Sequence, residues 1–286
     1  MRWYLVTYEN FAEKVKNPVD RWMWQVFQEA KIDRIQVCNA FTLAYKMYPF
    51  TRKKRILDIG SGYGLVDLIL LRKNWCNCAY LVDIMYNYSP ICPPLAKQDD
   101  QIHLLREHPT ENLLVYYLAK KLHVRHKIHF MWGSIQNPSA ILFLSTIQKH
   151  FQVILGLNTC GKLSDFVTYL GLYLNKNVIN LACCPHKIKN KSLKVIYARH
   201  GSRGLRCVRS SPFIYAGYMY RERSCKLLEK SGRVLSYITI LTRKRKTKKI
   251  SMIEFFNNMA QDKNWRKSTL QPDLTKALEQ IHFDIL

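Results

Sequence analysis

The sequence lacks the features of a membrane or repetitive protein. It contains no run of about 18 apolar residues, the length that a membrane-spanning helix needs. It also lacks internal repeats, low-complexity tracts and an obvious linker. Glu9 and Glu13 near the start argue against a signal or transit peptide. We therefore expect an intracellular chain with no membrane segment, whose 286 residues form one domain with additions or two small ones.

Acidic residues are scarce. The chain has 20 Asp and Glu against 45 Lys and Arg, which gives a formal net charge of +25. Polyanions are the natural partners of such a chain, because each phosphate that a cation neutralises releases condensed counterions. The alternative is a solvated basic surface, or a chain from a basic organellar proteome. The charge therefore favours RNA as a partner and leaves nucleus, cytoplasm and mitochondrion open.

The cysteines lack the pattern of a disulfide framework. There are nine of them, an odd number without even spacing, which is typical of a reducing intracellular compartment. Cys76, Cys78 and Cys92 lack the paired knuckles of a strong zinc site. We expect buried or loop cysteines and no metal.

Only 11 glycines are present, yet three of them follow one apolar run. Residues 55–64 read RILDIGSGYG, and a helical pattern over 65–71 follows. A strand, a Gly-rich turn and a helix let a Rossmann-type sheet bring its backbone against a nucleotide-like ligand, since a Cβ there would hold the ligand away. The alternative is an ordinary strand-to-helix turn. No phosphate-gripping Lys-Ser or Lys-Thr pair follows, and the GxGxxG of dinucleotide enzymes is absent.

The loop instead resembles motif I of class I methyltransferases, which bind S-adenosylmethionine (SAM). This resemblance assigns Asp58, Gly60, Ser61, Gly62 and Gly64 to a SAM site.

A second strand supports this assignment. Residues 78–84 read CAYLVDI, and Asp83 stands 19 residues after Gly64. An acidic side chain at the tip of the second strand of a βαβ unit accepts hydrogen bonds from the two ribose hydroxyls of an adenosine. Asp83 and the adjoining Ile84 are therefore predicted cofactor-binding residues.

Strands and helices alternate along the rest of the chain. This pattern predicts an α/β protein with a Rossmann-like, doubly wound, mostly parallel sheet and helices on both faces. Right-handed crossovers place the carboxyl ends of the strands at one edge, where ligands bind. After the second strand, we expect helices at 110–122, 138–149 and 211–230, and strands at 127–132, 152–157, 177–183 and 233–241.

The first 50 residues form a separate helical lead-in. We expect helices at 19–31 and 35–47, the second ending before Pro49, and we expect this part to cap the cofactor site. Residues 51–286 would form the Rossmann-like methyltransferase domain, with a basic hairpin or flap inserted at about 186–210. An aromatic stripe could stack on bases, although core packing is the favoured interpretation; its members are Trp22, Trp24 and Phe27.

Two strand ends point to a narrower resemblance. Residues 156–164 read GLNTCGKLS, and residues 183–186 read CCPH. This pair resembles the eukaryotic tRNA acceptor-stem 2′-O-methyltransferases and their methyltransferase-like relatives, over about residues 50–190. The resemblance implies SAM as cofactor and RNA as substrate. It adds two further groups of site residues, which share Asn158: Gly133, Ser134, Leu157 and Asn158 near the cofactor, and Asn158, Thr159 and His186 near the acceptor atom.

Three departures from that family matter. Asn158 stands where the family has His, so an amide that orients the acceptor replaces a proton acceptor. Lys162 replaces an acid, and Ser134 stands where an Asp often contacts adenine. His186 is the remaining candidate base, because its ordinary pKa of about 6.5 leaves it largely neutral at physiological pH; the alternative is a surface-loop histidine.

The sequence thus predicts a SAM-dependent methyltransferase that acts on RNA, with basic segments 187–209 and 243–249 as phosphate-binding surfaces. The second segment, 243–249, could instead be a nuclear localisation signal or a solvated turn. A catalytically silent methyltransferase-like scaffold for RNA or a ribonucleoprotein is the first alternative. A protein or RNA-cap methyltransferase is the second, and the Lys-Asp-Lys-Glu tetrad of cap enzymes is not met because Asn158 occupies the fourth-strand position.

Overall fold

The computed structural model describes residues 2–83, 106–107, 113–133, 135, 138–159, 162–182, 218–230 and 232–243. None of the described helices is both long and apolar enough to cross a membrane. The helices are η1 (Trp3–Leu5), α1 (Phe11–Lys14), α2 (Pro18–Glu29), α3 (Arg34–Thr51), α4 (Leu65–Arg72), α5 (Leu114–Lys121), η2 (Arg125–Lys127), α6 (Pro138–Thr146), η3 (Gln148–His150) and α7 (Lys162–Tyr173).

Eight described strands form one sheet in the order β3-β4-β2-β1-β5-β6-β8-β7. The five strands from β4 to β6 are parallel, in the order of a doubly wound Rossmann fold. Two antiparallel additions flank them: β3 pairs with β4, and the β7–β8 hairpin adds to β6. The strands are β1 (Arg55–Ile59), β2 (Cys78–Asp83), β3 (Arg106–Glu107), β4 (Ile128–Trp132), β5 (Val153–Thr159), β6 (Asn177–Ala182), β7 (Tyr218–Glu229) and β8 (Gly232–Arg243).

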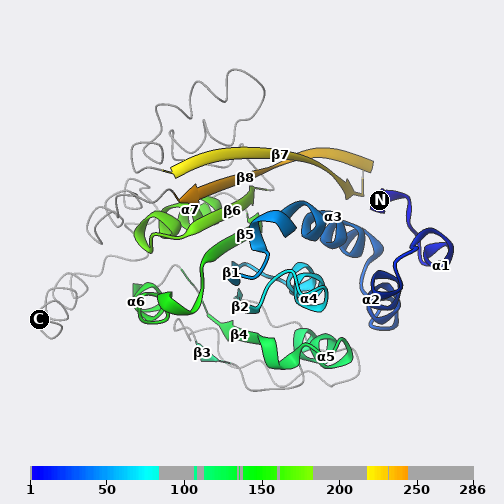
Figure 1. Cartoon of the computed structure of the whole chain (residues 1–286), viewed down its shortest axis with the longest axis horizontal. Coiled ribbons are helices and arrows are strands. Elements are labelled where there is room, and N and C mark those ends of the chain that lie inside the picture. Colours follow the sequence, from blue (N-terminus) through cyan, green and yellow to red (C-terminus); the bar gives the residue numbers. More distant parts are fainter. Residues whose placement is uncertain are drawn as a thin grey trace, which may run out of the picture.

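Helices cover both faces of the sheet (Figure 1). On one face, α2 to α5 enclose a core that takes alternate residues of the strands, such as Ile56 and Leu155. On the other face, α6 and α7 pack against the intervening residues, such as Leu57 and Ile154. This alternation follows from the two-residue repeat of a strand. The mostly parallel, doubly wound α/β fold expected from the sequence is confirmed.

The lead-in helices begin as expected and end differently. Asn17 caps α2 by accepting a hydrogen bond of 3.0 Å from the backbone N–H of Asp20, and Pro18 occupies the first turn. The prediction that the next helix stops before Pro49 was wrong, since α3 continues to Thr51. A proline removes only one helical hydrogen bond. The fully buried Thr51 turns its hydroxyl back to the Met47 carbonyl, at 3.4 Å.

The predicted helix at 211–230 is also wrong where the structure describes it. Residues 218–229 form β7, which pairs with β8 over twelve positions. The segment has a two-residue repeat, and its members Cys225 and Leu227 are buried under α3. Gly232 closes the hairpin with a φ of +122°, a conformation that glycine adopts without strain. Long-range pairing therefore overrides the local helical tendency of this segment.

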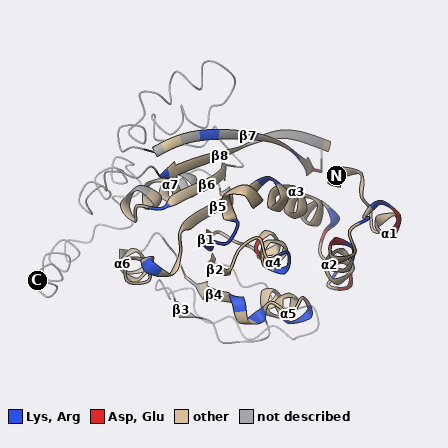
Figure 2. Ribbon diagram, in the orientation of Figure 1, with Lys and Arg blue, Asp and Glu red and all other residues tan. Residues whose placement is uncertain are grey.

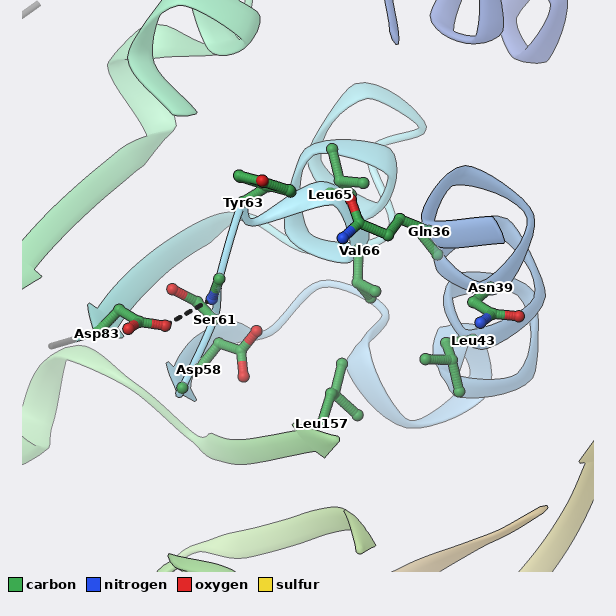
Figure 3. Close-up of a pocket in the computed structure, with 13 residues that line it drawn as sticks. Gln36, Asn39, Leu43, Asp58, Ser61, Tyr63, Leu65, Val66, Asp83 and Leu157 are labelled. Carbon is green, nitrogen blue, oxygen red and sulfur yellow. Dashed lines mark hydrogen bonds between the residues drawn. The ribbon is translucent and has the colours of Figure 1, made fainter. Parts of the chain in front are cut away.

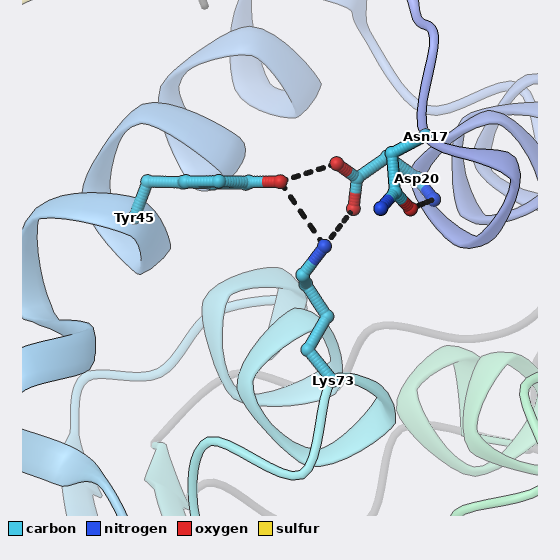
Figure 4. Close-up of polar contacts among 4 residues, drawn as sticks. All are labelled: Asn17, Asp20, Tyr45 and Lys73. Atoms are coloured by element: carbon cyan, nitrogen blue, oxygen red, sulfur yellow. Dashed lines mark hydrogen bonds and ion pairs between the residues drawn. The ribbon is translucent and has the colours of Figure 1, made fainter.

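Three polar side chains join α2, α3 and α4 (Figure 4). Lys73 forms a 2.7 Å ion pair with Asp20, and it donates to the Tyr45 hydroxyl at 3.0 Å. Tyr45 in turn donates to the other carboxylate oxygen of Asp20. Burial, together with this hydrogen bond to Asp20, raises the pKa of Tyr45. The cluster thereby ties the lead-in helices to the first helix after the Gly-rich loop.

The aromatic stripe of α2 belongs to the core. Trp24 and Phe27 are completely buried, and both lie against Phe41 of α3. Trp22 is partly buried at the edge of the same core. Core packing, the interpretation favoured from the sequence, accounts for Trp24 and Phe27.

Candidate functional site

A pocket of about 380 Å³ opens at the carboxyl edge of the sheet (Figure 3). It lies beside the ends of β1 and β5, where the strand order reverses, and this is the place where open α/β sheets bind ligands. Four groups of residues line it: the Gly-rich loop, two strand-end carboxylates, one face of α3, and the end of β5. They are Gln36, Asn39, Ala40, Leu43, Asp58, Gly60, Ser61, Gly62, Tyr63, Leu65, Val66, Asp83 and Leu157.

The three loop glycines all have left-handed backbone angles. The φ values are +70° at Gly60, +55° at Gly62 and +63° at Gly64. A Cβ at Gly60 would lie 3.3 Å from Leu163, and one at Gly64 would lie 3.1 Å from Val115. A Cβ at Gly62 would meet no protein atom within 4 Å. Gly62 is therefore the position where a missing side chain leaves room for a ligand, whereas the other two make room for the protein's own side chains.

Asp83 lies across the pocket from α3 and holds the loop in place. The backbone N–H of Gly62 donates to its Oδ2 at 2.7 Å, a short charge-assisted hydrogen bond. The backbone N–H of Gly60 donates to the Val82 carbonyl at 2.8 Å, which docks the loop against the end of β2. The predicted placement of Asp83 beside the glycines is what the structure shows, and its role in holding a ribose stays a prediction.

The Ser61 hydroxyl, in the pocket lining, is buried without a hydrogen-bond partner among the described residues. Buried polar atoms are normally satisfied, so an unpaired hydroxyl in a pocket indicates where a ligand would bind. Ser61 and Asp58, which also lines the pocket, were both predicted for the cofactor site.

Asp58 shares its environment with a second buried acid, Asp67 of α4. Burial raises the pKa of Asp58 well above its usual range, and the charge and hydrogen bond of Asp67 raise it further. Burial also raises the pKa of Asp67, to about 7, although the hydrogen bond to Asp58 partly offsets this. Two adjacent buried carboxylates cannot both ionise cheaply, so this pair retains a proton at pH values where an exposed aspartate has lost it.

The wall contributed by α3 was not foreseen residue by residue. Gln36 and Leu43 line the pocket with Asn39 between them (Figure 3). The Asn39 amide donates to the Leu228 carbonyl at 2.9 Å and accepts from the Leu228 N–H at 2.7 Å. This two-way bond fastens α3 to the edge strand β7. The sequence does contain a signal for this wall: Gln36 and Asn39 are polar residues one helical turn apart, so they lie on the same face of the helix.

The end of β5 carries a buried polar network. Thr159 is 2% exposed, and its hydroxyl donates to Oδ1 of Asn180 at 3.1 Å. The Asn180 amide in turn donates to the Thr168 hydroxyl at 3.1 Å. Leu157 lines the pocket, and the pairing of β5 with β6 is irregular between Leu157 and Thr159. Thr159 therefore has a structural partner, and its part in placing an acceptor stays a prediction.

The remaining predicted site residues are described only in part. Gly133 is buried and is not among the lining residues, but its N–H donates at 3.1 Å to the carbonyl of Asp83, which does line the pocket. Of Asn158 only the backbone, within β5, is described. Ile84, Ser134 and His186 lie outside the described residues. The two basic segments lie outside them as well, except for Arg243 at the end of β8.

Within the described part of the chain, no three His, Cys, Asp or Glu side chains come close enough together to hold a metal ion. Of the described free cysteines, Cys38, Cys76 and Cys225 are buried and Cys78 is partly exposed. Burial raises the pKa of Cys38 to about 11 and also raises the pKa of Cys76.

No protein-family profile matches the sequence, and a search of curated proteins finds no match either. Solved structures do match at low identity. An O-methyltransferase from Bacillus cereus in complex with SAH is 13% identical, with a TM-score of 0.44 over 82% of this chain and 96% of its own. A putative O-methyltransferase from Klebsiella pneumoniae is 11% identical, with a TM-score of 0.44 over 83% and 95%. The B. subtilis M1A22 tRNA methyltransferase TrmK is 12% identical, with a TM-score of 0.42 over 73% and 66%.

Similarities this low say nothing about the reaction. The fold follows from the strand order itself, in which β8 lies antiparallel between β6 and β7 beside five parallel strands. The chain has a Rossmann-like class I methyltransferase fold. The narrower resemblance to tRNA acceptor-stem 2′-O-methyltransferases stays a prediction.

Proposed function

We propose that this chain is a SAM-dependent methyltransferase that acts on RNA. The observation that carries the proposal is the pairing of Gly62 and Asp83 at the rim of the pocket. The 2.7 Å hydrogen bond between them holds a carboxylate beside a main-chain position with no Cβ. A nucleoside needs both features, because its hydroxyls require an acceptor and its bulk requires close approach to the backbone.

The residues present suit this cofactor. Asp83 presents its carboxylate at the pocket, and carboxylate oxygens accept hydrogen bonds of the kind that ribose hydroxyls donate. Asp58 lines the pocket and would face the amino group of the methionyl part, and the buried Ser61 hydroxyl, unpaired among the described residues, suits its carboxylate. Gln36 lines the opposite wall, from α3. When bound, SAM supplies a methyl group on a positively charged sulfur.

The chain's own contribution to methyl transfer is alignment. An in-line displacement needs the acceptor atom held behind the methyl group, and positioning alone can supply effective molarities on the order of 10⁵ M or more. Leu157, near the end of β5, lines the pocket and immediately precedes Asn158. Asn158 would orient the acceptor, and His186 would take its proton where one must leave.

RNA is proposed as the substrate because of charge. A formal net charge of +25 favours a polyanion, and a polyanion of nucleotides also offers methyl acceptors. The alternative function, a catalytically silent RNA-binding scaffold, is favoured by one specific feature. Asn158 stands at the end of β5 where the family that the sequence resembles has a proton-accepting His.

The test is a calorimetric titration of the full chain with SAH, followed by incubation with RNA and labelled SAM. We expect saturable SAH binding that Asp83→Ala weakens, and transfer of label to RNA. The matched control is Glu13→Ala, which removes an exposed carboxylate of α1 far from the pocket lining. Absence of binding at millimolar SAH would refute the assignment of SAM as the cofactor. Binding of SAH without transfer to any cellular RNA fraction would favour the scaffold.

A further inference from the structure

A second pocket, of about 250 Å³, lies at the opposite edge of the sheet from the Gly-rich loop. Val153 and Asn177 line it, and they are the first residues of β5 and β6. The pocket therefore opens at the amino ends of the parallel strands. None of its lining residues also lines the pocket at the carboxyl edge.

The cavity exists because α3 ends before the sheet does. Its rim includes Pro49 and Phe50, in the last turn of α3. Its floor includes Ile179 and Ile240, which belong to the core on the α3 side of the sheet. Among the described lining residues beyond Thr51, Lys54 precedes β1 and the others lie in strands, with β7 contributing Met219, Arg221 and Arg223.

Three cations line the pocket. The two-residue repeat of β7 places Arg221 and Arg223 on the same side of the strand as the buried Cys225. Lys54 approaches from the segment between α3 and β1. No carboxylate is among the lining residues that the structure describes. Figure 2 shows acidic residues on α1, α2 and α4, and the β7 segment itself contains Glu222 and Glu229.

Within the described part of the chain, none of these cations forms an ion pair. Arg223 lies over the Phe50 ring, 4.9 Å from its centroid, and the Arg221 guanidinium contacts the Met219 sulfur at 3.9 Å. Partial burial lowers the pKa of Lys54. The C-terminal dipole of α3 contributes about half a negative charge, which offsets only a small part of three formal positive charges.

We propose that this second pocket binds a phosphate group. A guanidinium presents a planar fork that matches phosphate oxygens, and an ammonium acts as a point charge beside it. Three cations in one lining suit a phosphate group, whose several oxygens can accept from more than one cation, whereas a single carboxylate would satisfy one arginine. The volume is below the range of about 300–1,000 Å³ typical of sites that enclose whole small molecules. The pocket therefore takes one group of a ligand, from free phosphate or from a nucleic-acid backbone.

The proposal does not depend on methyl transfer and can be tested separately. The test variant is Arg221→Gln with Arg223→Gln in the full chain. The matched control is Lys226→Gln with Lys230→Gln, which removes two exposed positive charges from the same hairpin, outside the pocket lining. Equal thermal midpoints of both variants in chloride would establish that both are folded.

Two measurements distinguish the sources of phosphate. The first is fluorescence anisotropy with a single-stranded RNA oligomer over a range of salt. We expect the arginine variant to bind about tenfold more weakly than the lysine control, and its salt dependence to be flatter by about 0.7 in log–log slope, the contribution of one single-strand phosphate contact. The second is the rise in thermal midpoint when inorganic phosphate replaces chloride at equal ionic strength. We expect this rise to be lost in the arginine variant.

An effect in the RNA measurement assigns the site to a nucleic-acid backbone, and an effect in the phosphate measurement alone assigns it to a small phosphate ligand. The proposal is overturned if the two variants behave alike in both measurements. It is also overturned if polyglutamate alone distinguishes the two variants. In that case polyglutamate would bind the lysine control more tightly than the arginine variant, whereas RNA and phosphate would bind both variants equally. An SAH titration of both variants separates this result from the proposed function, because neither pair of substitutions touches the cofactor pocket.

Discussion

The two glycines at the ends of the sequence Gly62-Tyr63-Gly64 should respond in opposite ways to the same substitution. Both have left-handed φ values, +55° and +63°, so alanine at either costs about 1–2 kcal/mol of backbone strain. At Gly64 the new Cβ also lies 3.1 Å from Val115 and 3.4 Å from Leu81, and overpacking of this kind adds about 1–3 kcal/mol. At Gly62 it meets no protein atom within 4 Å.

We therefore expect Gly64→Ala to lower the free energy of unfolding by about 2–5 kcal/mol, and Gly62→Ala by about 1–2 kcal/mol. Cofactor affinity should show the reverse order, because only the Cβ at Gly62 occupies space open to a ligand. We expect Gly62→Ala to weaken SAH binding by about tenfold or more, which corresponds to about 1.4 kcal/mol. Chemical denaturation measures the first quantity and calorimetric titration the second.

The control is Gly232→Ala, at a hairpin turn with a φ of +122° and no atom within 4 Å of a new Cβ, far from the pocket lining. It should lower stability without changing SAH affinity. The reasoning would be refuted if Gly62→Ala bound SAH as tightly as the unmodified chain, or if it destabilised the fold more than Gly64→Ala.

Three further predictions follow from buried charge. Asp83→Ala should weaken SAH binding by about 1–3 kcal/mol, since it leaves the N–H of the loop and the ribose hydroxyls without an acceptor, and unchanged affinity in a calorimetric titration would remove it from the site. The raised pKa values of Asp58 and Asp67 mean that the folded chain keeps a proton which the unfolded chain loses above its ordinary pKa of about 3.9. The contribution of this pair to stability is thus largest at acidic pH and falls as pH rises from about 4 toward 7, by at most about 1.4 kcal/mol per pH unit for one proton. Asp67→Asn should reduce this fall when denaturation at pH 5 is compared with denaturation at pH 8, and an unchanged difference between the two pH values would count against the shared proton. Asp20→Ala should lower the free energy of unfolding by about 3–5 kcal/mol, because it leaves Lys73, only 10% exposed, without its counter-charge, and a loss as small as that of an exposed acid would contradict this.

Local signals predicted the centre of the fold well. The strand, loop and helix from Arg55 to Arg72 agree with the expected bounds within one residue, and β2 ends at Asp83, one residue early. The residues that specify these elements lie close together in the sequence: apolar runs, glycines that accept a left-handed backbone, and an acid at a strand end. The spacing between Gly62 and Asp83 likewise predicted that they lie together.

The sequence-based prediction was wrong where the conformation of a segment depends on residues far away in the sequence. The segment that forms β7 mixes long polar and apolar residues that suit a helix, and only its pairing with β8 makes it a strand. Pro49 is tolerated inside α3 because its neighbours Met47 and Thr51 are completely buried. The sequence argument also treated all three loop glycines as ligand-facing, whereas packing against Val115 and Leu163 explains two of them.

The amino-acid sequence by itself determined the alternation of strands and helices, the Gly-rich turn and the carboxylate opposite it, because each depends on residues close together in the chain. Tertiary structure alone decided which glycine faces open space, that α3 supplies a wall of the first pocket, and that Lys54 meets Arg221 and Arg223 at the second. Those neighbours come from strands and helices far apart in the chain, and only the order of strands in the sheet brings them together.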